Sequence, residues 1–167
     1  MFIWQYINLP EDEVIKIQNE FRLKLPTNDL FFQNLNIETT TFFGMEIKAA
    51  VLIQAPPWAG LNNGGIHTDV NNTKLAINIP LENCEDSITS FWESSIPPML
   101  HQTPNKHSYA YYDQNYCKKI TEFKLNKPVI LNTSIPHTVT NLSSKWRRAI
   151  SLRFTEDPWN LTGSSVK

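Results

Sequence analysis

Cysteine is scarce in this chain, and long apolar runs are absent. The 167 residues include only Cys84 and Cys117, and neither has a second Cys or a His at zinc-finger spacing. A disulfide framework is therefore excluded, and we expect free thiols in a reducing compartment. No stretch of about 18 apolar residues occurs, and the N-terminus MFIWQYINLPEDE lacks the basic start and apolar core of a signal peptide. We expect a soluble, cytoplasmic protein with no membrane partner.

The chain also lacks an excess of charge of either sign. Fifteen basic residues stand against sixteen acidic ones, and the net charge is -1. Without a basic surface to hold a phosphate backbone, nucleic acid is not an expected partner. The length and the 41% hydrophobic content suit a single domain over residues 1–167, and no internal repeat or linker-like segment divides it. The oligomeric state is left open.

One helix is predicted near the N-terminus. Acidic residues 11–13 suit its first turn, and Pro26 ends a pattern of apolar residues at spacings of three and four, namely Val14, Ile17, Phe21 and Leu25. A second, weaker helical turn is expected to begin at Thr27 or Asn28 and to bury Leu30, Phe31 and Leu35. Residues 1–40 would then form a helical cover.

From Phe42 onward, short apolar runs bounded by Pro, Gly, Asn and Asp are typical of strands. So many short strands must close on themselves or pack together, which predicts a mostly β fold, a jelly roll or related double-sheet barrel; a sandwich or a small closed barrel is the alternative. The β core is expected over 42–155, followed by a tail over 156–167. The predicted strands are 46–55, 66–70, 74–81, 87–93, 108–112, 119–125, 128–133, 136–141 and 147–155.

The segment GGIHTDVNN carries the first candidate chemistry. His67 and Asp69 are separated by one residue, so on a strand both side chains leave the same face and can meet one metal ion. His137, after a proline at a strand start, is the third candidate ligand. Two imidazoles and one carboxylate form the facial triad of non-haem Fe(II) oxygenases, which leaves open positions for a chelating co-substrate and O2.

An arginine, Arg147, follows the candidate ligand His137 along the chain, at the start of a predicted strand. Strand alternation over 147–154 places Arg147 and Ser151 on a face of small and polar residues, whereas Arg148 shares a packing face with Ile150, Leu152 and Phe154. A guanidinium is a natural partner for a buried carboxylate, because it offers two parallel charged hydrogen bonds. Arg147 is therefore preferred over Arg148 as the anchor of a dicarboxylate.

The order His67-x-Asp69, His137, Arg147, with the phrases GGIHTD, LAINIPLENC, SIPHTV and R-x-A-I-S-L-x-F, resembles the Fe(II)/2-oxoglutarate-dependent oxygenases. It is most similar to the small prolyl- and aspartyl-hydroxylase-like proteins of bacteria and phages. The resemblance covers roughly residues 46–155. It implies a double-stranded β-helix of the cupin kind, with the N-terminal helix covering one sheet. It also implies Fe(II) held by the two histidines and the aspartate, with 2-oxoglutarate and O2 as co-substrates.

The resemblance further implies the residues that contact 2-oxoglutarate. Arg147 would anchor its distal carboxylate, and Ser151 would be an auxiliary donor, although it lies four residues from the arginine where many family members have two. Asn78 and Gln54 stand where members of this group often place a polar co-substrate contact. The alternative for both is a hydrogen bond to the protein's own backbone.

Two regions are predicted to contact the substrate, namely the loop over 56–65 and the strand that carries Arg147. The loop over 56–65 is rich in Pro, Gly and Asn and is expected to close over the substrate, with Trp58 in contact. Arg153 shares the inward face with Arg147 and would meet a carboxylate of the substrate; the alternative is an internal salt bridge to an acid. Trp92, Tyr109, Tyr111 and Tyr112 line either the pocket or the core.

The leading functional prediction is a dioxygenase that hydroxylates an amino acid, a peptide or a protein side chain. His101 and His107 are excluded as ligands, because their polar neighbours indicate solvated loops. One rival is a cupin-type metal protein without oxygenase activity, such as an isomerase or a sensor, which would have no need of Arg147. The other is a structural or binding jelly-roll module in which the histidines are incidental.

Overall fold

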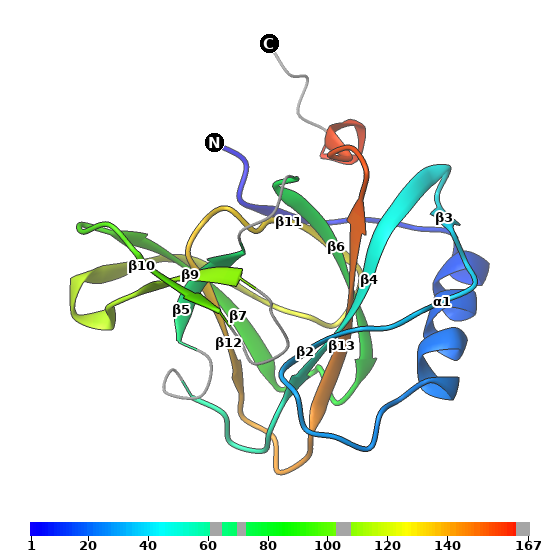
Figure 1. Cartoon of the computed structure of the whole chain (residues 1–167), viewed down its shortest axis with the longest axis horizontal. Coiled ribbons are helices and arrows are strands. Elements are labelled where there is room, and N and C mark those ends of the chain that lie inside the picture. Colours follow the sequence, from blue (N-terminus) through cyan, green and yellow to red (C-terminus); the bar gives the residue numbers. More distant parts are fainter. Residues whose placement is uncertain (61–64, 70–72, 103–107, 163–167) are drawn as a thin grey trace.

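The computed structural model describes residues 1–60, 65–69, 73–102 and 108–162, and within them the chain forms two antiparallel sheets and a helix (Figure 1). The larger sheet has the strand order β1 (Trp4–Tyr6), β11 (Val129–Asn132), β6 (Leu75–Glu82), β13 (Arg147–Phe154), β4 (Met45–Ala55) and β2 (Phe32–Asn34), with β3 (Thr41–Phe42) also beside β4. The smaller sheet has the order β10 (Cys117–Lys124), β7 (Ser87–Ser94), β12 (His137–Asn141), β5 (Ile66–Asp69), β9 (Ser108–Tyr112) and β8 (Met99–Gln102).

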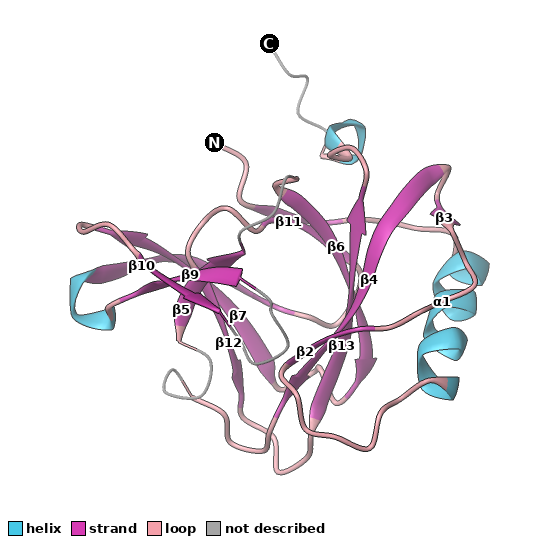
Figure 2. Cartoon of the chain, viewed as in Figure 1, coloured by secondary structure: helices cyan, strands magenta, loops and turns pink. Residues whose placement is uncertain are grey.

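The nine strands expected from the sequence are all present, so the mostly β fold is confirmed (Figure 2). Four further strands, β1, β2, β3 and β8, have four residues or fewer. Segments this short carry too little alternation to be recognised. The architecture is a two-sheet sandwich of the jelly-roll type, and no helix in the described part of the chain is long and apolar enough to cross a membrane.

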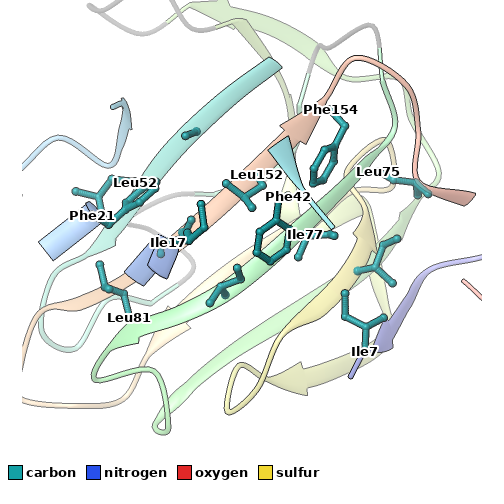
Figure 3. Packing of buried hydrophobic residues seen from close by; sticks show 14 residues of the cluster. Ile7, Ile17, Phe21, Phe42, Leu52, Leu75, Ile77, Leu81, Leu152 and Phe154 are labelled. Atoms are coloured by element: carbon teal, nitrogen blue, oxygen red, sulfur yellow. The ribbon is translucent and has the colours of Figure 1, made fainter. Parts of the chain in front are cut away.

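The predicted N-terminal helix is confirmed as α1 (Glu11–Leu23), with Glu11, Asp12 and Glu13 in its first turn. Ile17 and Phe21 are fully buried against the larger sheet, on the face that carries Leu52, Ile77 and Leu152 (Figure 3). This helix covers the outer face of that sheet. The site described below lies on the other face.

The second predicted helical turn is wrong. The segment after Asn28 forms β2, which pairs with β4 in the register Phe32 with Ile53, Gln33 with Leu52 and Asn34 with Val51. Of the residues that suggested a helical turn, Phe31 lines a cavity between the sheets, Leu35 packs against the buried cluster that includes Ile17 and Phe21, and Leu30 is 41% exposed. The segment is extended because pairing with the long β4 satisfies its backbone. β2 thereby becomes the terminal strand of the larger sheet, next to the site.

A second cluster of buried side chains fills the interior between the sheets. It joins residues of the smaller sheet with residues of the larger one, namely Phe91 and Phe123 with Ala76, Leu131 and Ala149. On β13 the alternation is as expected: Ile150, Leu152 and Phe154 belong to the cluster under α1, and Ala149 faces the interior. Arg147, Ser151 and Arg153 share the parity of Ala149, so they face the interior too.

Candidate metal centre

Two strands of the smaller sheet bring His67, Asp69 and His137 together. His67 and Asp69 are on β5, and His137 begins β12, directly opposite His67 in the antiparallel ladder. The histidine rings lie 4.6 Å apart between centroids, and one ligand atom from each of the three residues lies within 4.8 Å of the others. Both histidines are buried. The spacing is therefore that of three side chains able to share one ion.

The backbone orients both imidazoles. Nδ1 of His67 lies 3.3 Å from the carbonyl oxygen of Gly65, and Nδ1 of His137 lies 2.9 Å from that of Ile135. When Nδ1 carries the proton and donates it to these carbonyls, Nε2 is left as the basic nitrogen of each ring. Nε2 of His67 is buried without a hydrogen-bond partner and lies 3.9 Å from Oδ1 of Asp69. A buried nitrogen left in this way is expected of a metal ligand.

Gly65 is needed at the turn before His67. Its φ is +64°, and a Cβ atom at this position would lie 2.3 Å from Cε2 of Tyr111. A larger residue would therefore be strained by its backbone and would collide with the ring. The position of the Gly65 carbonyl, which orients the His67 ring, therefore requires a glycine.

The carboxylate of Asp69 has a charged partner on the larger sheet. Nη2 of Arg153 donates to Oδ2 over 2.5 Å. Burial raises the pKa of Asp69, but Arg153 together with His137 and His67 lowers it further, so that the net pKa lies below its usual value. The group is thus an anion, the form that binds a metal.

His137 is held in its neutral form. Burial lowers its pKa to about 4, and His67 acts in the same direction, against the opposing effects of Asp69 and the Ile135 carbonyl. A neutral imidazole is the form that ligates metals. Asp69 and His137 are therefore in the protonation states that a divalent cation requires.

A set of unpaired polar side chains lies further along the interior. Arg147 is fully buried, and no oxygen of a described residue accepts a hydrogen bond from its three nitrogens; the polar group beside it is the Cys84 sulfur. Burial lowers the pKa of its guanidinium group, and the adjacent Cys84 thiol acts in the opposite direction. The hydroxyl of Ser151 and the Oδ1 atom of Asn78, which pair across β13 and β6, are also buried without partners. Buried polar groups of this kind are satisfied by water or by a polar ligand.

Gln54 does not belong to this interior, so its predicted contact with the co-substrate is wrong. Its Nε2 donates to the carbonyls of Asn28 and Leu30 over 3.1 Å each, and its Oε1 accepts from Nε of Arg148 over 2.9 Å. Arg148 also donates to Glu82 over 2.6 Å. Both side chains therefore lie on the opposite face of the sheet. Strand alternation decided this, since Gln54 pairs with Arg148.

Arg153 likewise has a different partner from the one predicted. Instead of standing free for a substrate carboxylate, it pairs with Asp69, and its Nη1 donates to the hydroxyl of Thr133 over 3.0 Å. The internal salt bridge, stated above as the alternative, is what the structure shows. Sequence reasoning did not foresee that the acid is itself a candidate metal ligand, nor that Thr133 takes part.

A pocket of about 170 Å³ opens beside the candidate ligands. Its walls come from both sheets and are formed by Phe32, Asn34, Ala49, Val51, Asp69, Ser108, Tyr109 and Arg153. Phe32 and Tyr109 each meet the ring of His67 edge-on, at 6.0 Å between centroids. The contribution of β2 was missed because that segment was expected to be helical. Tyr109 was among the aromatic residues considered for the pocket.

A second, narrow cavity of about 20 Å³ lies deeper between the sheets. It reaches from the candidate ligands to Asn78, with further walls from Phe31, Phe32, Ile53, Thr89, Leu131 and Val139. This volume holds about one water molecule. Arg147 is not among the described residues that line it.

Other predicted residues lie away from these two cavities. Trp58 is 68% exposed, its φ is +57°, and its N–H donates to the carbonyl of Ser143. Residues 61–64 of the expected lid, and His107, lie outside the described residues. His101 is exposed on β8 and stacks on Tyr109 at 5.8 Å between centroids. The role of Trp58 stays a prediction.

Comparisons with known proteins give similarity in structure alone. No protein-family model matches the sequence, and no curated protein matches it significantly. Among solved structures, EvdMO1 matches with 15% identity and a TM-score of 0.49, over 90% of this chain and 46% of that chain. AviO1 from Streptomyces viridochromogenes Tue57 matches with 13% identity and a TM-score of 0.44, over 90% of this chain and 88% of that chain. The chain thus spans less than half the length of EvdMO1, and similarity at this level establishes no shared activity.

Proposed function

We propose that this protein is an Fe(II)- and 2-oxoglutarate-dependent oxygenase. The observation that carries the proposal is that a buried His, Asp, His set and a buried, unpaired arginine face the same interior. The His, Asp, His set is suited to a cation, and the arginine is suited to an anion. The two-sheet architecture would then be the double-stranded β-helix of that class.

The residues fit a divalent metal on the chemistry of their atoms. Nε2 of His67 is buried and unpaired, Asp69 is an anion, and His137 is neutral. Two imidazole nitrogens and one carboxylate oxygen are the donor set of the facial triad, which favours iron(II) and leaves coordination positions for other ligands. His67, Asp69 and His137 would hold the ion.

The interior also fits a dicarboxylate in its polar groups. No oxygen of a described residue accepts from Arg147, whose polar neighbour is the Cys84 sulfur, so its guanidinium is available for a carboxylate. Ser151 and Asn78 offer a hydroxyl and an amide on the same side of the sheet. The narrow cavity of about 20 Å³ is much smaller than 2-oxoglutarate. Binding therefore requires side chains such as Phe31 and Phe32 to move apart.

Each part of the site has a distinct task in the proposed reaction. Iron(II) with 2-oxoglutarate, held by His67, Asp69 and His137, would supply the chemistry for oxidising a C–H bond with O2. Arg147 orients the co-substrate by its distal carboxylate, and the apolar walls exclude water from the interior. The pocket of Phe32, Asn34, Ser108 and Tyr109 places the substrate beside Asp69. We propose a small molecule or the side chain of an amino acid, peptide or protein as the substrate, with hydroxylation as the outcome.

An anaerobic titration tests the metal site and the anchor together. Adding Fe(II) and then 2-oxoglutarate to the purified apoprotein should produce a metal-to-ligand charge-transfer band, because the 2-oxo acid chelates the metal. His137→Ala should abolish the band by removing a ligand. Arg148→Met, which alters the neighbouring arginine on the outer face, is the matched control and should retain it. If the wild-type protein binds Fe(II) but gives no band with 2-oxoglutarate, the oxygenase proposal is wrong.

The size of the inner cavity favours a second candidate, a metal protein without oxygenase activity. A space of about 20 Å³ suits a protein that binds a cation and takes its ligand from the outer pocket alone. The same titration separates the two candidates, since this one predicts Fe(II) binding with no effect of 2-oxoglutarate.

A further inference from the structure

The guanidinium of Arg153 is held on two sides. Nη2 donates to Oδ2 of Asp69, and Nη1 donates to the hydroxyl of Thr133. That hydroxyl donates its single proton to the carbonyl of Lys74 over 3.1 Å, so its lone pairs are left for the guanidinium. Arg153 is 7% exposed. It therefore has one well-defined position inside the protein.

Asp69 is hydrogen-bonded to Arg153 through its side chain and to Thr133 through its backbone. Its carboxylate accepts from Arg153, and its N–H donates to the carbonyl of Thr133 over 3.1 Å. With Oδ2 occupied by Arg153, the other oxygen, Oδ1, is the one that lies toward Nε2 of His67, 3.9 Å away. The network thus decides which carboxylate oxygen faces Nε2 of His67.

The pairing of β13 with β4 is irregular next to this arginine. Arg153 stands opposite Ala49 and Phe154 opposite Ile47, so the extra residue, Lys48, belongs to β4 and the alternation of β13 continues through Arg153. Such irregularities occur next to functional sites. The small Ala49 leaves room beside the guanidinium.

We infer that Arg153 is a positioning residue that holds Asp69 as a one-oxygen metal ligand. The inference rests on the proposed function, because it presupposes a metal at the three ligands. Without Arg153, the carboxylate is free to rotate and to present both oxygens to the metal. A two-oxygen ligand would take up a coordination position that the proposed co-substrates need.

Binding of Co(II), used as a spectroscopic probe, tests this inference apart from catalysis. Arg153→Met removes the charge and both hydrogen bonds, and should weaken Co(II) binding about 10- to 100-fold, as loss of a partner to a metal ligand typically does. The visible Co(II) spectrum should also change, because Oδ2 becomes available to the metal. Arg153→Lys retains the charge next to Asp69 and should recover much of the affinity.

The matched control is Arg148→Met, which removes an ion pair from the outer face of the same strand. It should leave Co(II) affinity and spectrum unchanged. Unfolding of the apoproteins, followed by circular dichroism, shows which variants fold. If Arg153→Met does not fold, Thr133→Val decides, since it deletes only the hydroxyl that holds Nη1. It should cost about two- to tenfold in affinity, the value of one hydrogen bond.

The outcomes separate the two proposals. If the wild-type protein binds no Co(II), the proposed metal site itself fails. If wild type binds Co(II) and the folded Arg153→Met, or Thr133→Val in its place, binds it with the same affinity and the same spectrum, the metal site stands and the positioning role of Arg153 is wrong.

Discussion

His137 lies directly opposite His67 across the β5 and β12 ladder, with 4.6 Å between the ring centroids. Within the described residues this is the one register pair between β5 and β12, whereas on its other side β12 pairs with β7 from His137 to Asn141. The candidate metal centre therefore depends on the exact docking of two short strands. A change in the alignment of β5 and β12 should therefore weaken metal binding before it affects the rest of the fold.

Replacing Arg147 with Met should stabilise the apoprotein while removing its affinity for 2-oxoglutarate. The guanidinium is buried beside the Cys84 sulfur, with no oxygen partner among the described residues, so folding bears most of its desolvation cost. Replacement of a buried ion pair by apolar side chains of similar volume is often neutral or stabilising by about 1–4 kcal/mol, and we expect a gain in this range for the single guanidinium. Urea denaturation measures the gain, and isothermal titration with 2-oxoglutarate in the presence of Fe(II) measures the loss.

Binding of Fe(II) in the absence of 2-oxoglutarate provides the control for the Arg147→Met variant. Arg147 is not one of the three candidate ligands, so Fe(II) binding should be retained. A destabilised variant would contradict the description of Arg147 as an unpaired charge. Unchanged 2-oxoglutarate binding would contradict its role as the anchor.

The stability of the apoprotein should fall as the pH is lowered from about 6.5 to about 4. His137 has a pKa of about 4 in the folded protein and an ordinary value of 6.5 when unfolded. Between these values the unfolded chain binds the proton and the folded one does not, so acid favours unfolding. The contribution is about 3 kcal/mol at most. Below pH 4, Asp69 acts in addition, because its lowered pKa stabilises the folded state only while it is ionised.

Urea denaturation at a series of pH values, with a chelator present, measures this dependence. His137→Gln cannot titrate and should show a flatter profile between pH 6.5 and 4. An equally steep profile in the variant would assign the pH dependence to other groups.

Gly65→Ala should weaken metal binding and lower stability, whereas Gly60→Ala should do neither. An alanine at 65 has to adopt a φ of +64° and would place its Cβ 2.3 Å from Tyr111, so the turn that presents the carbonyl to His67 must shift. Strain of this kind costs about 1–3 kcal/mol. At Gly60 no atom lies within 4 Å of an added Cβ. Thermal unfolding and Co(II) titration of the two variants provide the comparison, and equal behaviour would show that the turn is not required.

Local patterns in the sequence predicted much of this protein. The acidic start and apolar spacing of α1, and the nine strands, follow from side-chain periodicity, which is a property of neighbouring residues. The same periodicity placed His67 and Asp69 on one face of a strand, and it separated Arg147 from Arg148. These features need no knowledge of distant contacts.

Only the tertiary structure decided which distant residues meet. Pairing with β4 made an extended strand of the segment expected as a helical turn, and it turned Gln54 outward with Arg148. Arg153 was predicted to face the interior, but its partner Asp69 comes from the opposite sheet. Alternation gives the face of a side chain, whereas the identity of its neighbour depends on how two sheets are packed, and that is set by the whole core.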